Sequence, residues 1–155
     1  MHYLITSHCT APGGQELALA VNHNPGQDPV IVLWADPTDD HQLWTPIAYV
    51  RSGEGPQGIA FVNAGTGEAL AAPEDNSGAV MVALDEIDDR STWTFGEDDW
   101  AIEEHALRPY GSDTMNLNLF GGGPYNPGNP VGVWDWGDGQ PNELWKFTLV
   151  DTDAV

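Results

Sequence analysis

Residues 133–147 read VWDWGDGQPNELWKF, and the order of residue types in this stretch has counterparts twice earlier in the chain. Trp134 and Trp136 are two residues apart, which places both rings on one face of a β-strand. A turn of small and polar residues follows and ends at Leu144 and Trp145. The stretch therefore predicts a strand, a turn and a second strand that begins at Trp145.

Three similar phrases end at a tryptophan: DDHQLW at Trp44, DDRSTW at Trp93 and QPNELW at Trp145. The tryptophans recur about every 50 residues, a spacing that indicates a repeat architecture. Upstream of each comes an apolar run, then a turn rich in Gly, Pro or Asn, and before that an alternating stretch. With the first strand of each unit added, the sequence predicts three units of about four short strands.

One such unit cannot bury its apolar face alone, so the three must fold together. We expect one all-β domain over residues 1–155, with repeats at approximately 1–50, 55–98 and 100–150. Closure into a threefold barrel with a hairpin cap would remove exposed strand edges. No stretch of the chain keeps a helical period for three turns, which agrees with this all-β class.

The charge balance excludes several classes of partner. Twenty-four acidic residues face four basic ones, for a net charge of −20. Such a surface repels phosphate groups, so we expect no nucleic acid partner and no membrane insertion. The single cysteine, Cys9, excludes an internal disulfide. Residues 1–14 have neither a basic region nor a long apolar run, so we expect a cytoplasmic protein, with non-classical secretion as the alternative.

Three segments carry a resemblance to a known family. The tripeptide QLW at Gln42 to Trp44 resembles the Gln-x-Trp signature of ricin-B-type (R-type) β-trefoil lectins, and FVNAGTGEAL at 61–70 resembles the first hairpin of their repeats. The segments MNLNLF and VGVWDWGDGQPNELWKF together resemble the third repeat of these lectins, including the Euonymus-type lectins. The sequence departs from the signature in two repeats, where Ser91 and Glu143 stand in place of the glutamine.

The resemblance implies an all-β β-trefoil and assigns the three repeated tryptophans to its core. In the family these positions are mostly buried, so Trp44, Trp93 and Trp145 should fill the pseudo-threefold centre. Large aromatic rings stabilise a core through the apolar area that they remove from water. These three rings are therefore not expected to contact a ligand.

The resemblance also implies a shallow sugar site on the third repeat. Sites of this family combine an acidic or amide side chain, an aromatic ring under the apolar face of the sugar, and a second polar side chain. Asn118 falls where the family carries Asp, and an amide can both donate and accept hydrogen bonds. Trp134 falls at the ring position, with Trp136 as the alternative, and Asn142 matches the second polar residue. The competing interpretation is that both rings pack under the turn.

Two turn residues, Asp138 and Gln140, extend the predicted third-repeat site toward the rim hydroxyls of a sugar. The first repeat has Ala20 at the acidic position, and its ring is slightly out of register, so a second, shifted site would use Asn22, Trp34 and His41. The second repeat has Ala71 at the acidic position and no aromatic residue in AVMVALDE, so we expect it to bind no sugar.

No motif for catalysis, a metal or a cofactor emerges from the sequence. The histidines lack metal-ligand spacing, and neither a Gly-x-Ser-x-Gly nor a phosphate loop occurs. We therefore expect a non-catalytic lectin that binds carbohydrate or glycoprotein glycans. The alternative is a lectin-like protein-interaction subunit of a larger enzyme, similar to the light subunit of fungal tyrosinase, with sugar binding lost. A protein partner or a homodimer is then the expected partner.

Overall fold

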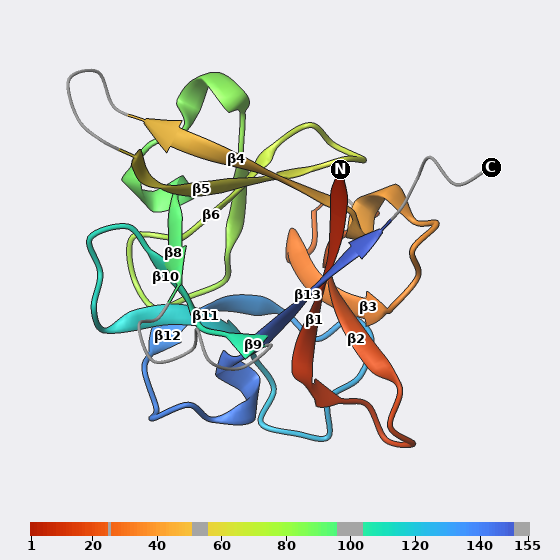
Figure 1. Ribbon diagram of the computed structural model, residues 1–155. Coiled ribbons are helices and arrows are strands. Elements are labelled where there is room, and N and C mark those ends of the chain that lie inside the picture. Colours follow the sequence, from red (N-terminus) through yellow and green to blue (C-terminus); the bar gives the residue numbers. More distant parts are fainter. Residues whose placement is uncertain (25, 51–55, 96–103, 151–155) are drawn as a thin grey trace.

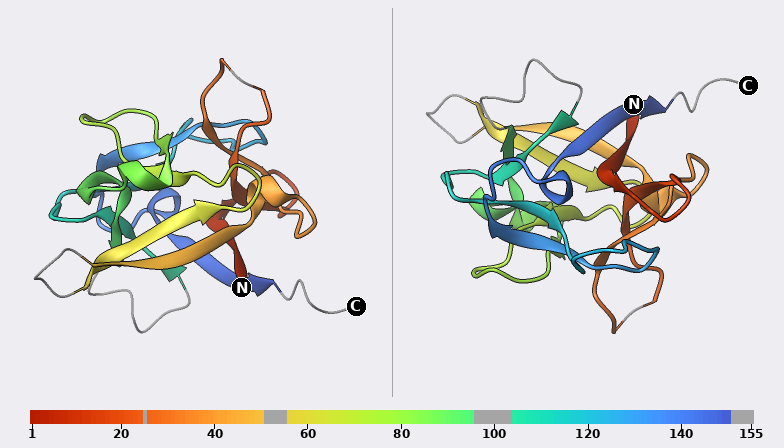
Figure 2. Two further views of the ribbon diagram at one scale, coloured as in Figure 1. Left: turned by 90° about the horizontal axis from the view of Figure 1, so that it is seen from above. Right: turned by 90° about the horizontal axis from the view of Figure 1, so that it is seen from below.

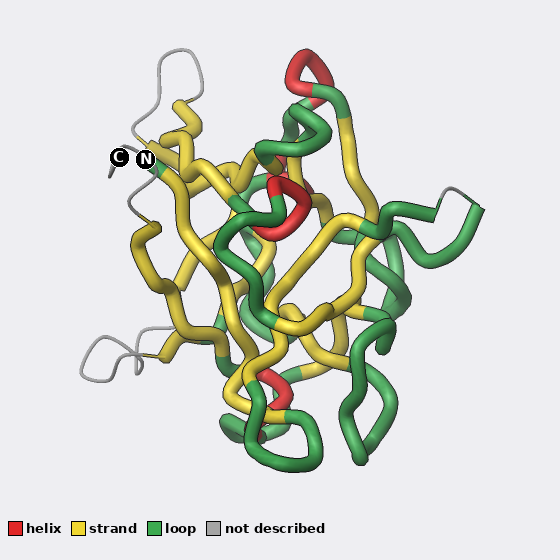
Figure 3. The backbone as a smooth tube through the Cα atoms, turned by 90° about the vertical axis from the view of Figure 1, so that its right-hand side faces the viewer, coloured by secondary structure: helices red, strands yellow, loops and turns green. Residues whose placement is uncertain are grey.

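The computed structural model describes residues 1–24, 26–50, 56–95 and 104–150. The beginning of the predicted third repeat, residues 100–103, lies outside this range. The described part is built from short strands and single turns of 3-10 helix, as Figure 3 shows. The strands are β1 (His2–Thr10), β2 (Glu16–Val21), β3 (Val30–Trp34), β4 (Trp44–Val50), β5 (Pro56–Asn63), β6 (Ala69–Ala71), β7 (Val80–Val82), β8 (Trp93–Phe95), β9 (Glu104–His105), β10 (Leu107–Pro109), β11 (Met115–Leu119), β12 (Val131–Asp135) and β13 (Trp145–Val150).

Strand pairing closes a barrel. The hydrogen-bonded order is β10-β8-β5-β4-β1-β13-β9, and β9 and β10 follow each other directly in the chain. The path therefore begins and ends on one segment, which leaves no free edge along the ring. The register of β1 with β13 places His2 opposite Val150, so the two ends of the described chain lie side by side (Figure 2).

The remaining strands form three hairpins, β2–β3, β6–β7 and β11–β12 (Figure 1). One hairpin belongs to each predicted repeat, between its first and fourth strands. Isolated bridges join the hairpins of different repeats, at Ile31 with Pro130 and at Gly78 with Gly132. The hairpins therefore hold one another in place.

Each repeat has a turn of 3-10 helix that ends two residues before its repeated tryptophan. These turns are η1 (Asp40–Gln42), η3 (Asp89–Ser91) and η5 (Pro141–Glu143), and a further turn, η2 (Leu84–Glu86), precedes η3. The residue that stands at the glutamine position of the signature is the last residue of each of the three turns. It is buried in all three repeats. The threefold pattern therefore extends from the strands to their connections.

The core confirms the predicted role of the three repeated tryptophans. Trp44, Trp93 and Trp145 are at most 1% exposed. Each ring removes about 200 Å² from water, which stabilises the fold by on the order of 5 kcal/mol. Each indole N–H also donates to a leucine carbonyl of the same repeat, at Leu19 (3.0 Å), Leu70 (2.9 Å) and Leu117 (3.0 Å). The chain is thus the all-β trefoil that the repeats predicted.

Candidate functional site

The hairpin β11–β12 presents the predicted site of the third repeat. Its register places Asn118 opposite Gly132 and Asn116 opposite Trp134. The alternating residues Leu117 and Val133 are fully buried in the core. Because successive side chains of a strand point to opposite faces, Asn118 and Trp134 share the outer face of the hairpin.

Beside this face lies an open depression of about 650 Å³. It brings together five of the six residues predicted for the third repeat. These are Asn118, Trp134, Trp136, Gln140 and Asn142. The sixth, Asp138, is exposed but does not line the depression, and it has a positive φ of 61°. The sequence missed Asp135 and Glu143, which do line it.

The two tryptophans of the site differ in how much of the ring is open. Trp134 is 52% exposed, and Phe120 meets it edge-on at 6.3 Å between ring centroids. Trp136 is half-buried, and the guanidinium carbon of Arg108 lies 4.9 Å from the centre of its ring. A cation at this distance is attracted to the ring and covers it. Trp134 is therefore the ring with room for a ligand.

The amide side chains of the site are fixed by hydrogen bonds. Asn118 is 2% exposed, and its amide oxygen accepts from the Asn116 amide nitrogen at 3.2 Å. Asn142 donates through its amide nitrogen to the Leu119 carbonyl at 3.2 Å, which leaves the oxygen of that amide as an acceptor. Asn142, which is partly exposed, can contact a ligand with little loss of conformational freedom, whereas Asn118 is almost fully buried.

Glu143 organises the turn that forms one wall of the depression. It is 3% exposed, and its carboxylate accepts backbone N–H bonds from Gly137 (2.5 Å), Gly139 (3.1 Å) and Gln140 (3.1 Å). Hydrogen bonds to an ionised acceptor are stronger than those between neutral groups. The sequence shows Glu143 only as a departure from the signature; the glycines four and six residues before it, Gly139 and Gly137, were the available signal.

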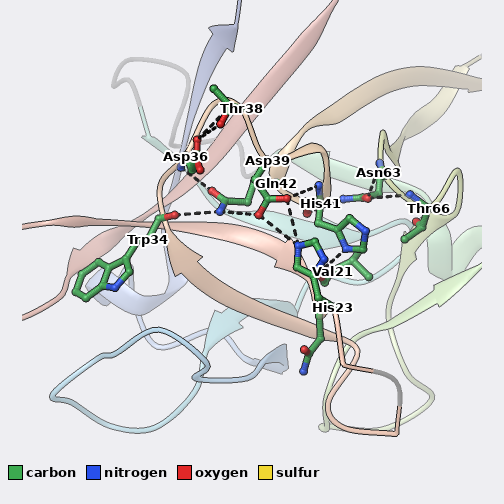
Figure 4. Close-up of polar contacts among 12 residues, drawn as sticks. Val21, His23, Trp34, Asp36, Thr38, Asp39, His41, Gln42, Asn63 and Thr66 are labelled. Atoms are coloured by element: carbon green, nitrogen blue, oxygen red, sulfur yellow. Dashed lines mark hydrogen bonds and ion pairs between the residues drawn. The ribbon is translucent and has the colours of Figure 1, made fainter.

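Gln42 occupies the same position in the first repeat and acts in the same way (Figure 4). Its amide oxygen accepts from the Asp36 N–H at 2.8 Å, and its amide nitrogen donates to the Trp34 carbonyl at 3.0 Å. Ser91, in the second repeat, accepts from the Asp88 N–H at 2.9 Å. The first residue of the signature therefore holds the turn before each tryptophan in place through hydrogen bonds. Its side chain differs between the repeats because the backbone groups that it binds differ.

The structure does not bring the three residues predicted for a second site into one pocket. The ring of Trp34 points away from His41, as Figure 4 shows, and lines a crevice with Gln15, Glu16 and Ala35. Asn22 holds its own turn, because its amide donates to the Asp28 carbonyl at 3.0 Å.

Two stacked imidazoles occupy the part of the first repeat that corresponds to the third-repeat depression. Counted from the two hairpins, His23 corresponds to Gly121. Counted back from the repeated tryptophans, His41 corresponds to Asn142, because each lies three residues before its tryptophan. The rings of His23 and His41 lie 3.7 Å apart and nearly parallel. His41 donates to the Val21 carbonyl at 3.0 Å, as Asn142 does to Leu119. The chain thus fills with its own rings the space that it leaves open in the third repeat.

The described residues offer little other chemistry. Within them, no group of three or more histidine, cysteine, aspartate or glutamate side chains is placed to hold a metal ion. No helix in the described ranges is long and apolar enough to span a membrane. Burial raises the pKa of the Cys9 thiol, and burial likewise raises the pKa of Tyr125, which is hydrogen-bonded to Cys9. Neither residue lines the depression.

Comparisons with known proteins show the fold. No protein-family model matches the sequence, and no curated protein matches it. The designed threefold-symmetric protein ThreeFoil matches with a TM-score of 0.74 and 17% identity, over 96% of this chain and 99% of that one. The ricin B-like lectin of Macrolepiota procera, solved with lactose, matches with a TM-score of 0.68 and 20% identity, over 95% and 94%.

A third similar structure is an exo-β-1,3-galactanase from Clostridium thermocellum, with a TM-score of 0.66 and 18% identity. The match covers 96% of this chain but only 30% of the galactanase chain. At such identities the likeness shows a common fold, the β-trefoil, and says nothing of the ligand. What this chain binds has to be argued from its own residues.

Proposed function

We propose, from the fold that it shares with ricin B-like lectins, that this protein is a non-catalytic lectin that binds a mono- or oligosaccharide on its third repeat. One observation carries the proposal: a half-exposed indole, Trp134, stands in an open depression rimmed by the amides of Gln140 and Asn142. Ligand sites combine such an apolar surface with a few polar groups that fix orientation. The residues of this depression supply both parts.

The chemistry of the depression suits a neutral pyranose. The apolar C–H face of the sugar would lie on Trp134, and its hydroxyls would bond to groups that accept or donate, such as Asn142 and Gln140. Asp135, an exposed carboxylate, adds an acceptor. An open site with these contacts would bind at about the millimolar level, roughly −4 kcal/mol. Several sites on one ligand or one assembly would then be needed for tight binding.

The two carboxylates of the depression support binding without catalysis. Glycosidases of the usual kind need two carboxyl groups on opposite sides of the scissile bond. Glu143 is buried, and three backbone N–H groups already bond to its oxygens. Asp135 is therefore the one exposed carboxylate that lines the depression among the described residues, and its Oδ1 already accepts from the Asn76 amide at 3.2 Å.

A glycan array followed by calorimetric titration of the best neutral glycan tests this proposal. We expect saturable binding by the wild-type protein, at least a tenfold loss in Trp134→Ala (about 1.4 kcal/mol), and unchanged binding in Asp138→Asn. The second variant is the matched control, because Asp138 lies in the same turn and does not line the depression. If Trp134→Ala binds as tightly as the wild type, the sugar does not lie on the third repeat.

A second candidate function is a protein-interaction role within a larger assembly. The favouring observation is that the similar part of the galactanase is under a third of that chain, so the fold there belongs to a larger enzyme. In this role the depression would hold a protein partner in place of a sugar. An array without any binding, together with an enzyme that copurifies with the native protein in fixed ratio, would favour this candidate.

A further inference from the structure

Trp34 is the second large aromatic ring that the described chain leaves open. It ends β3 and is 46% exposed. Ala20 pairs with Ile31 as Asn118 pairs with Gly132, so Leu33 takes the place of Trp134 and Trp34 lies one residue further on. A shift of one residue turns a side chain to the other face of a strand. Trp34 is therefore not a displaced copy of the third-repeat ring.

The backbone that carries Trp34 is held from two sides. Its carbonyl accepts from the amide nitrogen of Gln42, which is only 2% exposed. On the other side, the N–H of the next residue, Ala35, donates to the Glu16 carbonyl at 3.1 Å. The backbone position of Trp34 is thus fixed, so a ligand that covers the ring does not have to order the backbone beneath it.

Polar side chains flank this ring. Trp34 lines a crevice of about 260 Å³ together with Gln15, Glu16 and Ala35. Leu17 pairs with Trp34 across the hairpin, and Gln15 and Glu16 immediately precede Leu17 in the chain. Glu16 is exposed and adds a carboxylate. Within the described residues the indole N–H of Trp34 has no hydrogen-bond partner, whereas that of Trp44 donates to Leu19.

We propose that Trp34, Gln15 and Glu16 form a second saccharide site, separate from the third-repeat depression and from His41. The ring would lie under the C–H face of one neutral sugar residue, and its N–H would donate to a ring substituent. The Glu16 carboxylate would accept hydroxyl hydrogens, and the Gln15 amide would accept or donate. In this site neither Ala20, at the acidic position of the first repeat, nor Gln42, at the signature position, contacts the ligand. Gln42 serves it as a positioning residue.

The seven indole N–H signals of the ¹⁵N-labelled protein test this site without relying on the third repeat. Trp34→Phe and Trp134→Phe assign the two exposed rings, and Trp44 serves as a buried reference. The probes are methyl mannoside, methyl galactoside, N-acetylglucosamine and lactose, each taken well above about 1 mM so that a weak complex forms. Choline is the competing probe, because an indole beside a carboxylate also suits a cation.

We expect the Trp34 signal to move with at least one sugar, saturably, while the Trp44 signal stays in place. Glu16→Gln should reduce the apparent affinity several-fold, and Trp134→Phe should leave the Trp34 shift intact. A Trp34 signal that no sugar moves, or that only choline moves, overturns this site. Movement of Trp134 alone would leave the proposed lectin function standing, and movement of Trp34 alone would refute the third-repeat site instead.

Discussion

Glu143→Gln is the change that most sharply tests how the third-repeat site is built. In the wild-type protein one buried carboxylate accepts N–H bonds from Gly137, Gly139 and Gln140. The variant keeps the shape of the side chain and restores the glutamine of the Gln-x-Trp signature. Its amide has one accepting oxygen and one nitrogen that can only donate. At least one backbone N–H of the turn would then face another donor.

The expected effect follows from these bonds. A buried donor without a partner costs about 1–3 kcal/mol, and each remaining bond weakens by about 1 kcal/mol when its acceptor loses the charge. We therefore expect Glu143→Gln to lower the free energy of unfolding by about 3–5 kcal/mol, from one unpaired donor and two weakened bonds. The turn would also loosen, so sugar affinity at the depression should fall.

Urea denaturation of the wild type, Glu143→Gln and Asp138→Asn measures the effect. Asp138→Asn removes a negative charge from the same turn at an exposed residue, and Asn accepts a positive φ readily. It should change the free energy of unfolding by less than about 0.5 kcal/mol. If the two variants were equally stable, the three N–H bonds of Glu143 would not be what holds the turn.

Three further predictions follow from the core, the charge and the cysteine. Trp93→Phe should lower the free energy of unfolding by about 2–3 kcal/mol, because the buried Leu70 carbonyl loses its donor. Trp34→Phe, at an exposed ring, should change the free energy of unfolding little. Urea denaturation curves of the two variants that coincide would contradict this. Sialylated glycans should bind more weakly than their neutral parents to a protein of net charge −20. The difference in affinity should become smaller as added salt shortens the Debye length below about 10 Å. Equal affinities of the two kinds of glycan in calorimetry at low salt would contradict this prediction. Burial raises the pKa of the Cys9 thiol, so the folded state keeps the proton better than the unfolded state, and this contribution to stability is lost as pH rises through the folded pKa. Iodoacetamide should accordingly alkylate Cys9 more slowly in the native protein than in urea at mildly alkaline pH, and equal rates would refute this.

The barrel and its core could be predicted because their signals are local and repeated. Each tryptophan of the three phrases follows a turn and an apolar run at nearly constant spacing. The structure shows why the spacing matters, since each indole reaches back to a leucine carbonyl of its own repeat. A chain in which these distances varied would lose both the packing and the bond.

The position of Trp134 and Asn142 relative to Trp145 also follows from alternation and from the signature. Other features of the site depend on how segments meet in space. The stacking of His23 on His41 joins residues from different turns, and no pattern within either turn indicates it. For Trp34 the alternation pattern was not enough, because this residue lies one position further along β3 than the residue that corresponds to Trp134. Its ring therefore lines a different crevice.

Tryptophan fluorescence during titration with mannose and with galactose, on the wild type and on Trp134→Ala, tests the central claim most directly. Trp134 is 52% exposed, so its removal should leave the protein folded, which the unchanged urea midpoint would verify. Because Trp34 would also respond to a sugar at the second proposed site, Trp34 is replaced by Phe in both proteins. We predict a saturable change with Trp134 present that is lost or greatly reduced with Trp134→Ala. A saturable change that persists undiminished in the folded variant, or no change with any sugar, would contradict a lectin site on the third repeat.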